Sequence, residues 1–329
     1  MGRRARTRRA ATTAALLAAM VTASLAAGCT AHHGHPVDDG RGHGRTQTPT
    51  PGQSRSGGSG PVLAVKIDNV RAARPQTGLD SADVVYAEQV EGGLSRLMAV
   101  FATKLPKAVG PVRSARESDL ELLRQFDHPT LAFSGAQRRL LPLIAKAPLS
   151  AESPGEASGA YYRGSDKPAP HNLYLRPNRL LDSAPGAAAL TNGFEYGAAP
   201  GGGTPTTSRT VSYPSARFTF TWSASRHGWL ITEDGTPTMT SAGQRLAPPT
   251  VVVQYVKIRK SKFHDILGNN TPYTQTVGSG TAQVLRDGRA YDVHWKREQA
   301  TDGTKFTTAD GTPVNFAKGQ VWVVFAKAS

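Results

Sequence analysis

Cysteine is nearly absent from this sequence, since Cys29 is the only one among 329 residues. A single cysteine excludes a disulfide between two positions of the chain, and it excludes a zinc site built from several cysteines. Familiar catalytic motifs are missing too: Gly-x-Ser-x-Gly, Ser-x-x-Lys, His-Glu-x-x-His and Gly-x-x-x-x-Gly-Lys do not occur. We therefore assign no catalytic residue from the sequence, and we expect neither a cofactor nor a metal site.

Acidic residues are also scarce, because 24 Asp and Glu stand against 39 Lys and Arg, which gives a formal net charge of +15. Residues 1–60 hold eight Arg and two Asp, whereas residues 61–329 hold 31 basic and 22 acidic residues. The longer part has no dense basic run, so its charge indicates a moderately basic surface rather than a nucleic-acid-binding stripe. We expect no nucleic acid among the partners.

The first 29 residues have the pattern of an export signal. Arginines between Arg3 and Arg9 form a basic start, and residues 10–28 are uncharged and rich in Ala, Leu, Met and Val. This run ends in Leu25-Ala26-Ala27-Gly28-Cys29, which resembles the lipobox of bacterial lipoproteins. The resemblance implies that Cys29 receives a diacylglyceryl group and becomes the mature N-terminus. An uncleaved transmembrane anchor and plain secretion are the alternatives. We expect an extracytoplasmic protein that its N-terminal lipid anchors to the bacterial cell membrane.

Residues 30–60 consist mainly of Gly, Ser, Thr, Pro, His and Arg, with almost no aliphatic side chains. Such a segment cannot bury enough apolar surface to offset the entropy of ordering it. We therefore predict a signal peptide over residues 1–29 and a disordered tether over 30–60. Two domains are expected to follow, over 61–190 and 205–329, because a Gly-rich stretch at 201–203 separates two different patterns.

The first of these segments mixes strand and helix patterns. Apolar, β-branched runs predict strands over 62–67, 84–90 and 97–101, with Gly92-Gly93 as a hairpin-like break. Ser114 and Glu117 have the spacing of a capping box, which predicts the start of a helix, and residues 137–146 predict another that Pro142 shortens or kinks. Within residues 205–329, the segments 217–222, 251–258, 281–285, 290–295 and 321–325 alternate with a period of two. The expected fold class is α+β, with an α/β-type layered first domain followed by a mainly-β second domain.

Several strings of residues resemble a known family. In the first half they are Asp83-Val84-Val85-Tyr86, the segment Val90–Arg96, the segment Gly110–Arg116, and Asp119. In the second half they are His171-Asn172-Leu173-Tyr174, Val277-Gly278-Ser279-Gly280, Trp295 and Gly319-Gln320-Val321-Trp322. They resemble the YerB-like lipoproteins of unknown function, the DUF3048 family. The resemblance implies a cell-envelope lipoprotein with an α/β first domain and a β-rich second domain, and it implies no reaction.

A group of charged residues in the first domain is the candidate site. Glu88 and Arg96 flank the Gly92-Gly93 break, and a hairpin would bring the strands on its two sides within reach of each other. If Arg96, Arg113 and Arg116 converge beside the helix start, they form a fork-shaped receptor for a carboxylate or phosphate. The predicted ligand-binding residues are Arg96, Arg113, Arg116, Glu91 and Asp119, and the expected partner is an anionic cell-wall polymer or an envelope protein. In the alternative interpretation, the same charges pair internally and hold the loop to the sheet.

An envelope glycan or peptidoglycan hydrolase is the other functional alternative, with Glu88, Glu91 and Asp119 as its carboxylates. The spacing of Glu88 and Glu91 counts against it, because residues three apart on a strand point to opposite faces unless a turn intervenes. The adjacent pairs His264-Asp265 and His171-Asn172 also look catalytic. Adjacent strand residues face apart, and we interpret the second pair as a loop hydrogen-bonding group.

Overall fold

The computed structural model describes residues 60–265 and 267–329. The predicted signal peptide, Cys29 and the predicted tether up to residue 59 lie outside these residues. In the part of the chain that is described, neither α-helix has the length and apolar character needed to cross a membrane.

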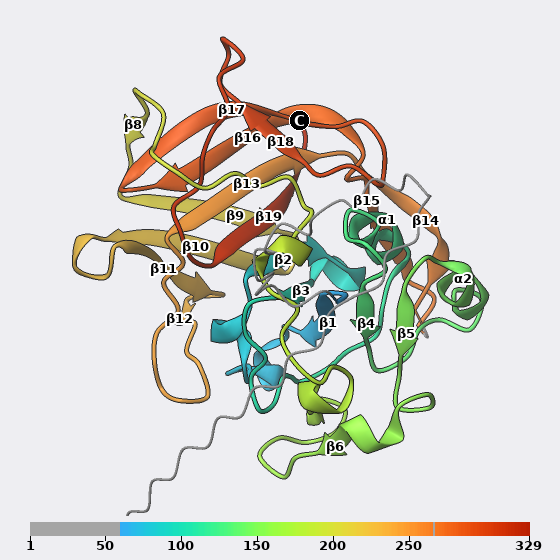
Figure 1. The fold of residues 1–329 in the computed structure, drawn as a ribbon. Coiled ribbons are helices and arrows are strands. Elements are labelled where there is room, and N and C mark those ends of the chain that lie inside the picture. The colour runs from blue at the N-terminus through green and yellow to red at the C-terminus, as the bar shows by residue number, and fades with distance from the viewer. Residues whose placement is uncertain (1–59, 266) are drawn as a thin grey trace, which may run out of the picture. The chain divides into compact units, whose positions relative to one another are not determined.

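Most of the described chain consists of strands (Figure 1). In the first half the elements are β1 Leu63–Asp68, β2 Val84–Gln89, β3 Ser95–Phe101, α1 Glu117–Leu123, β4 Thr130–Ala132, α2 Leu141–Lys146, β5 Ser150–Glu152, β6 Tyr161–Arg163 and β7 Leu173–Leu175. In the second half they are β8 Thr204–Pro205, β9 Ser208–Tyr213, β10 Ala216–Ser223, β11 Gly228–Glu233, β12 Thr236–Pro237, β13 Thr250–Val256, β14 Ile258–His264, β15 Asn270–Thr274, β16 Gly278–Arg286, β17 Arg289–Arg297, β18 Lys305–Thr307 and β19 Val321–Lys327.

One 11-stranded sheet runs through both halves, in the order β18-β17-β16-β13-β19-β2-β3-β1-β4-β5, with β8 paired to β17. The join between the halves is β19, which is parallel to β13 on one side and to β2 on the other. Val321 of β19 is in register with Val84 of β2. The two predicted domains thus contribute neighbouring strands to one sheet, and the prediction that each is a separable unit remains a prediction.

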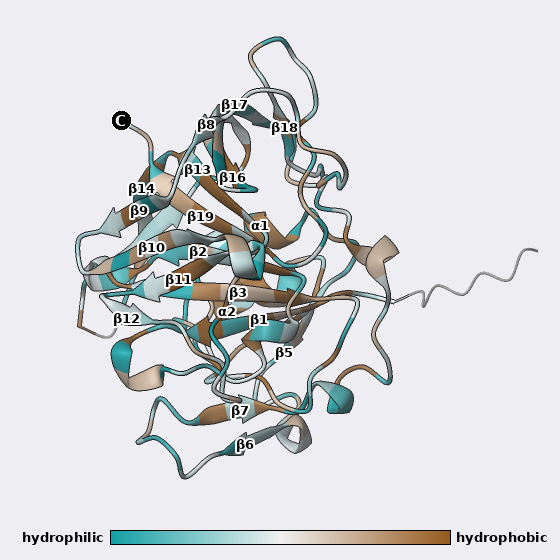
Figure 2. Ribbon diagram, turned by 90° about the vertical axis from the view of Figure 1, so that its left-hand side faces the viewer, coloured by the Kyte–Doolittle hydropathy of each residue, from teal (hydrophilic) through white to brown (hydrophobic). Residues whose placement is uncertain are grey.

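The large sheet is covered on both faces. On one face Phe218, Phe220 and Trp229 of the four-stranded sheet β12-β11-β10-β9 pack among residues such as Val65 and Trp322. These side chains are all almost fully buried. Figure 2 shows hydrophobic strands such as β3 running through the centre of the molecule. The tryptophans at 229 and 322 therefore belong to the core.

Both short α-helices belong to the opposite face. Leu122 and Leu123 of α1 and Ile144 of α2 are buried with sheet residues such as Met98. In Figure 1 these helices lie on the right-hand side, away from β9–β12. The described chain is mostly strand, as expected for its second half, and the α+β class expected for the whole chain is not confirmed. Only two short helices accompany β1–β5, so the α/β-type layering of the first half remains a prediction.

Both helices begin later than the sequence predicted. The N-cap of α1 is Arg116, whose backbone N–H donates to Oδ2 of Asp119 at 2.7 Å. The predicted capping pair of Ser114 and Glu117 is wrong. The Asp119 carboxylate accepts the hydrogen bond of the N-cap backbone N–H, and Ser114 lies two residues before the N-cap. Helix α2 begins at Leu141 with Pro142 in its first turn, where a missing N–H has no cost.

Candidate functional site: an arginine-lined cavity

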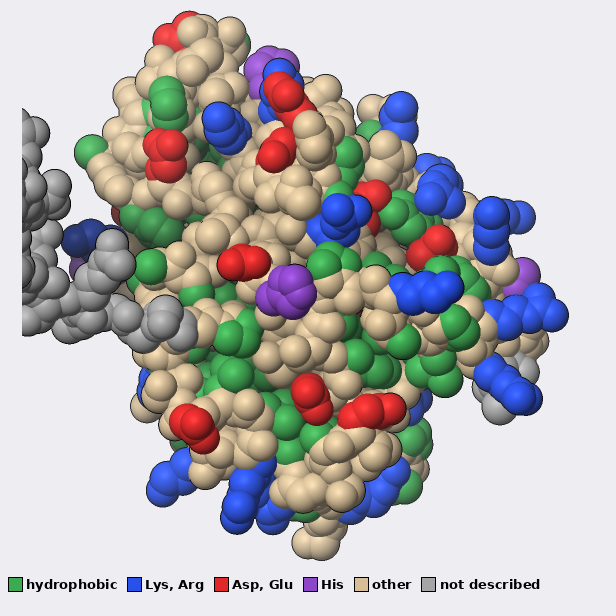
Figure 3. Space-filling view, turned by 45° about the vertical axis from the view of Figure 1, so that its right-hand side comes forward, with side chains coloured by type: hydrophobic (Ala, Val, Ile, Leu, Met, Phe, Trp, Pro, Cys, Tyr) green, Lys and Arg blue, Asp and Glu red, His purple; other side chains and the backbone are tan. Residues whose placement is uncertain are grey.

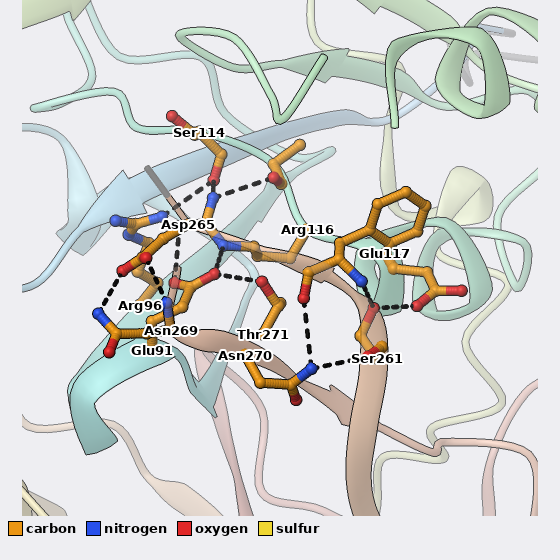
Figure 4. A network of polar contacts seen from close by, with 12 residues as sticks. Glu91, Arg96, Ser114, Arg116, Glu117, Ser261, Asp265, Asn269, Asn270 and Thr271 are labelled. Carbon is orange, nitrogen blue, oxygen red and sulfur yellow. Dashed lines mark hydrogen bonds and ion pairs between the residues drawn. The ribbon is translucent and has the colours of Figure 1, made fainter. Parts of the chain in front are cut away.

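A cavity of about 770 Å³ lies on the helix-bearing face of the large sheet, at one end of β2 and β3. Four segments that are far apart in the sequence line it: the β2–β3 turn, the segment before α1, the segment before α2 and the β14–β15 hairpin. The cavity therefore depends on both halves of the chain. Figure 4 shows the polar contacts between three of these segments, with Arg116 near the centre and Arg96 to its left.

The β2–β3 turn places the first pair of site residues. Gly92 and Gly93 both have a positive φ, of 66° and 70°, which glycine adopts at little cost. A Cβ atom on Gly93 would also lie 2.5 Å from the side chain of Pro214. The turn holds β2 and β3 in the register that sets Glu88 opposite Arg96, so the predicted hairpin is confirmed. Glu91 stands in the turn itself rather than on the strand.

Glu91 is held by Arg116 from the start of α1. The Arg116 Nε donates to Oε1 at 2.7 Å and its Nη2 donates to Oε2 at 2.8 Å, while the Thr271 hydroxyl of β15 donates to Oε1 at 2.5 Å. Burial acts to raise the pKa of Glu91, but the bonds from Arg116 and Thr271 outweigh it and lower that pKa. Glu91 is therefore an anion that ties the turn to α1 and to the β14–β15 hairpin.

Arg113 is paired as well, with a carboxylate that the sequence analysis did not single out. Its Nε lies 3.1 Å from Oδ2 of Asp68, a fully buried residue of β1. Nδ1 of His171 lies 2.8 Å from the same oxygen, which brings His171 to the margin of the site. The Arg113 side chain is 26% exposed and lines the cavity. Asp68 thus fixes the position of Arg113 and leaves its outer part accessible.

Arg96 differs from the other two arginines. Its one hydrogen bond within the described residues joins Nη1 to the backbone oxygen of Ser114 at 3.4 Å, and no described carboxylate lies within ion-pair distance of it. Burial lowers the pKa of Arg96 to about 10, and the neighbouring Arg116 and Arg113 guanidiniums contribute to this lowering. Arg96 is therefore a cation in the cavity wall whose charge is not neutralised by a direct partner.

Asp119 lies beneath the cavity rather than in its wall. It is fully buried, with Oδ2 bound to the Arg116 backbone N–H and Oδ1 accepting from Nζ of Lys66 at 2.7 Å. Lys66 is also fully buried, and it contacts Glu88 as well. The predicted ligand role of Asp119 is not supported by this placement, since both of its oxygens are already engaged. We assign Asp119 a structural role.

Glu88 belongs to the same buried cluster. The Ser118 hydroxyl of α1 donates to its Oε2 at 2.9 Å, and Lys66 contacts its Oε1. Burial raises the pKa of Glu88, although the charge of Lys66 acts in the opposite direction. Lys66, Glu88 and Asp119 thus form a closed group that joins β1, β2 and α1.

The hydrolase alternative required free carboxylates, and these three are all engaged. Glu88 and Asp119 share Lys66, and Glu91 is bound through both of its oxygens by Arg116. A general acid and a general base need access to substrate, which this pairing denies them. The turn at Glu91 removes the earlier objection from strand spacing, but the arrangement offers no catalytic pair.

Two further carboxylates, those of Glu117 and Asp265, and a further arginine, Arg138, also line the cavity. Glu117 accepts from the Ser261 hydroxyl at 2.5 Å, and Asp265 accepts from the backbone N–H groups of Leu267 and Asn269. Arg138 is exposed and lines the cavity. Figure 3 shows Lys and Arg side chains gathered towards the right-hand edge of one face of the molecule.

Among the residues described, no cluster of three or more His, Cys, Asp or Glu could hold a metal ion.

The structure brings together four of the five predicted ligand residues, Glu91, Arg96, Arg113 and Arg116, all of which line the cavity. It missed Lys66, Asp68 and the position of His171. One signal was available for two of them. Lys66 and Asp68 alternate in an otherwise apolar strand, and a polar residue at every second position points to one common face.

Comparisons with known proteins agree with this fold. The family described as "Protein of unknown function (DUF3048) N-terminal domain" matches residues 48–190, and its C-terminal domain matches residues 209–323. "Putative lipoprotein YerB" of Bacillus subtilis (strain 168) is 25% identical over 288 residues, which are 79% of this chain and 80% of that protein. A crystal structure of YerB protein from Bacillus subtilis has 20% sequence identity and a TM-score of 0.69. The superposition covers 82% of this chain and 91% of that one.

Proposed function

This chain belongs to the DUF3048 family, and from that premise we propose that it is a non-catalytic, extracytoplasmic lipoprotein that binds an anionic group of the cell envelope in the arginine-lined cavity. The proposal has two parts. The N-terminal segment sets the location of the protein, and the cavity sets what it binds.

Membrane anchoring is supported by Cys29 and by a relative. The only cysteine of the chain follows an uncharged run and two small residues, and the Bacillus subtilis relative carries the name of a lipoprotein. Two acyl chains hold a protein at a membrane far more firmly than one. A diacylglyceryl group on Cys29 would therefore be a sufficient anchor.

The observation that carries the binding proposal is that Arg96 has no ion-pair partner among the residues that the structure describes. A guanidinium in a partly buried position normally finds a carboxylate, because leaving a charge without a partner away from water is costly. Burial and the nearby guanidiniums of Arg116 and Arg113 lower the pKa of Arg96, and the charges of Asp68 and Glu91, which are already paired with those two arginines, oppose this lowering only in part. An anion in the cavity would supply the missing charge and would accept hydrogen bonds from the planar Arg96 group.

Arg113 and Arg116 support this site from fixed positions. Asp68 and Glu91 hold them in place, so little side-chain entropy is lost when a ligand arrives. The excess positive charge of residues 61–329 would attract anions over a distance, and added salt would weaken that attraction. The expected ligand carries a phosphate or carboxylate.

The test is a calorimetric titration with inorganic phosphate at low ionic strength. The full chain is used with Cys29→Ala, so that it carries no acyl group and needs no detergent. We expect saturable binding that weakens with salt. Arg113→Lys keeps the charge but loses the planar fork, and it should weaken binding by about tenfold while the protein stays folded.

Arg217→Lys is the matched control, because Arg217 is exposed and does not line the cavity. It should bind phosphate as the parent does. The proposal would be contradicted if neither the parent nor Arg113→Lys binds phosphate or acetate measurably and Arg113→Lys is destabilised. That result would support a purely structural role for the arginines.

A further inference from the structure

The cavity is much larger than the anion that Arg96 would bind. A phosphate group has the bulk of a few water molecules, or roughly 100 Å³, whereas the cavity measures about 770 Å³. Its arginines lie in β3, in the segment before α1 and in the segment before α2. Much of the remaining wall is apolar. The larger apolar side chains of that wall are Val70, Val90, Leu94, Leu140, Phe263 and Leu267.

Two of these apolar side chains are exposed at the cavity. Leu94 is 38% exposed and Leu267 is 82% exposed. Leu94 follows the Gly92-Gly93 turn, and Leu267 stands in the turn between β14 and β15. Leucines in two separate turns that meet at one cavity expose a shared apolar surface.

The neighbouring helix extends this pattern. Five large hydrophobic side chains are exposed among the described residues: Leu94, Leu141, Leu143, Tyr196 and Leu267. Leu94 and Leu267 line the cavity, and Leu141 and Leu143 lie in the first turn of α2, directly after the lining residue Leu140. Exposed apolar side chains that gather at one place mark a site of contact with an apolar ligand or surface. Of these five residues, Tyr196 alone neither lines the cavity nor lies near a lining residue in the sequence.

We infer that the cavity takes an amphiphilic anion, in which a phosphate or carboxylate lies against Arg96 and an attached aliphatic chain runs along Leu94, Phe263 and Leu267. This inference rests on the proposed anion binding and adds the chemical class of the ligand. The two halves of the wall match the two halves of such a molecule, since guanidiniums complement its charge and leucine side chains remove its chain from water. Each methylene buried in this way strengthens binding by roughly fourfold.

Three probes separate the charge from the chain: inorganic phosphate, octyl phosphate and octyl glucoside, each kept below its micellar concentration. The full chain with Cys29→Ala is titrated with each of them. Octyl phosphate should bind at least tenfold more tightly than either of the other two probes. Leu267→Ser should weaken octyl phosphate binding severalfold, and the high exposure of Leu267 means that this change leaves the core untouched. The matched control is Tyr196→Ser, which removes an exposed apolar side chain outside the cavity and should leave octyl phosphate binding as it is.

Three results would overturn the inference, and they are distinguishable. If inorganic phosphate binds as tightly as octyl phosphate, the chain adds nothing and only the proposed anion site stands. If octyl glucoside binds as tightly as octyl phosphate and Arg96→Gln has no effect on either, the cavity is a plain apolar site. If neither phosphate binds at all, the proposed function fails together with the inference.

Discussion

Arg116 donates two parallel hydrogen bonds to Glu91, from Nε to Oε1 at 2.7 Å and from Nη2 to Oε2 at 2.8 Å. This geometry uses the fork of the guanidinium, which is the part that would otherwise bind a ligand. Arg116 is therefore a positioning residue. The neighbouring Arg96 makes one hydrogen bond among the described residues, so its other N–H groups can donate to a ligand. Structural ion pairs and an arginine without an ion-pair partner among the described residues thus lie side by side in one cluster.

Removing Arg116 should be costly for stability. Arg116→Gln leaves the Glu91 carboxylate nearly buried without its cation, so we expect the free energy of unfolding to fall by about 3 kcal/mol. Urea denaturation of the variant and the parent measures this difference. Arg217→Gln serves as the control and should change it by less than about 0.5 kcal/mol. An Arg116→Gln variant as stable as the parent would show that the pair does not hold the turn.

The Glu91 pair also predicts how stability depends on pH. Burial alone would raise the pKa of Glu91, but Arg116 and Thr271 lower it below its ordinary value of 4.5. A carboxyl whose pKa is lower in the folded state stabilises that state above its unfolded pKa, and it loses this contribution as the pH falls through its folded pKa. Thermal melts of the parent and of Glu91→Gln should therefore differ most near neutral pH and converge below pH 4.5. Parallel curves over the whole range would contradict the assignment.

The buried Lys66 should be indispensable to the fold. Lys66→Met leaves Glu88 and Asp119 facing each other without a cation, and we expect a loss of about 3–5 kcal/mol in the free energy of unfolding. Adding Glu88→Gln removes one of the two carboxylates and should restore part of that loss. Urea denaturation of the single and double variants measures both. A single variant with the stability of the parent would refute the role of this cluster.

Local patterns were enough to predict the β2–β3 hairpin. Gly92-Gly93 marked the turn, and the turn fixed Glu88 opposite Arg96. Arg113 and Arg116 were expected beside a helix start, and they line one cavity with Arg96 of β3, but their role as a receptor remains a prediction. The hairpin could be predicted because it depends on residues close together in the sequence.

The buried partners could not be found in the same way. Lys66 and Asp119 are 53 residues apart, and Asp68 and His171 are 103 residues apart. Their contacts depend on how α1 and the segment before β7 pack on the sheet, which alternation within a strand does not specify. The placement of β19 between β13 and β2 is a long-range choice of the same kind.

Lipid attachment at Cys29 gives a prediction that concerns location alone. Intact-mass analysis of the membrane fraction should show a chain that begins at Cys29 and carries a diacylglyceryl group. Cys29→Ala should release the protein from the membrane, because the anchoring chains are absent. A membrane-bound chain without added lipid mass would favour an uncleaved N-terminal anchor instead.

Anion binding by Arg96 is tested most directly by paired calorimetric titrations and thermal melts of the parent and Arg96→Gln. Because Arg96 makes one long hydrogen bond and no ion pair among the described residues, the variant should lose less than about 1 kcal/mol of stability. Phosphate binding should disappear or weaken at least tenfold in this stable variant. Unchanged phosphate binding by a folded Arg96→Gln protein would contradict this expectation.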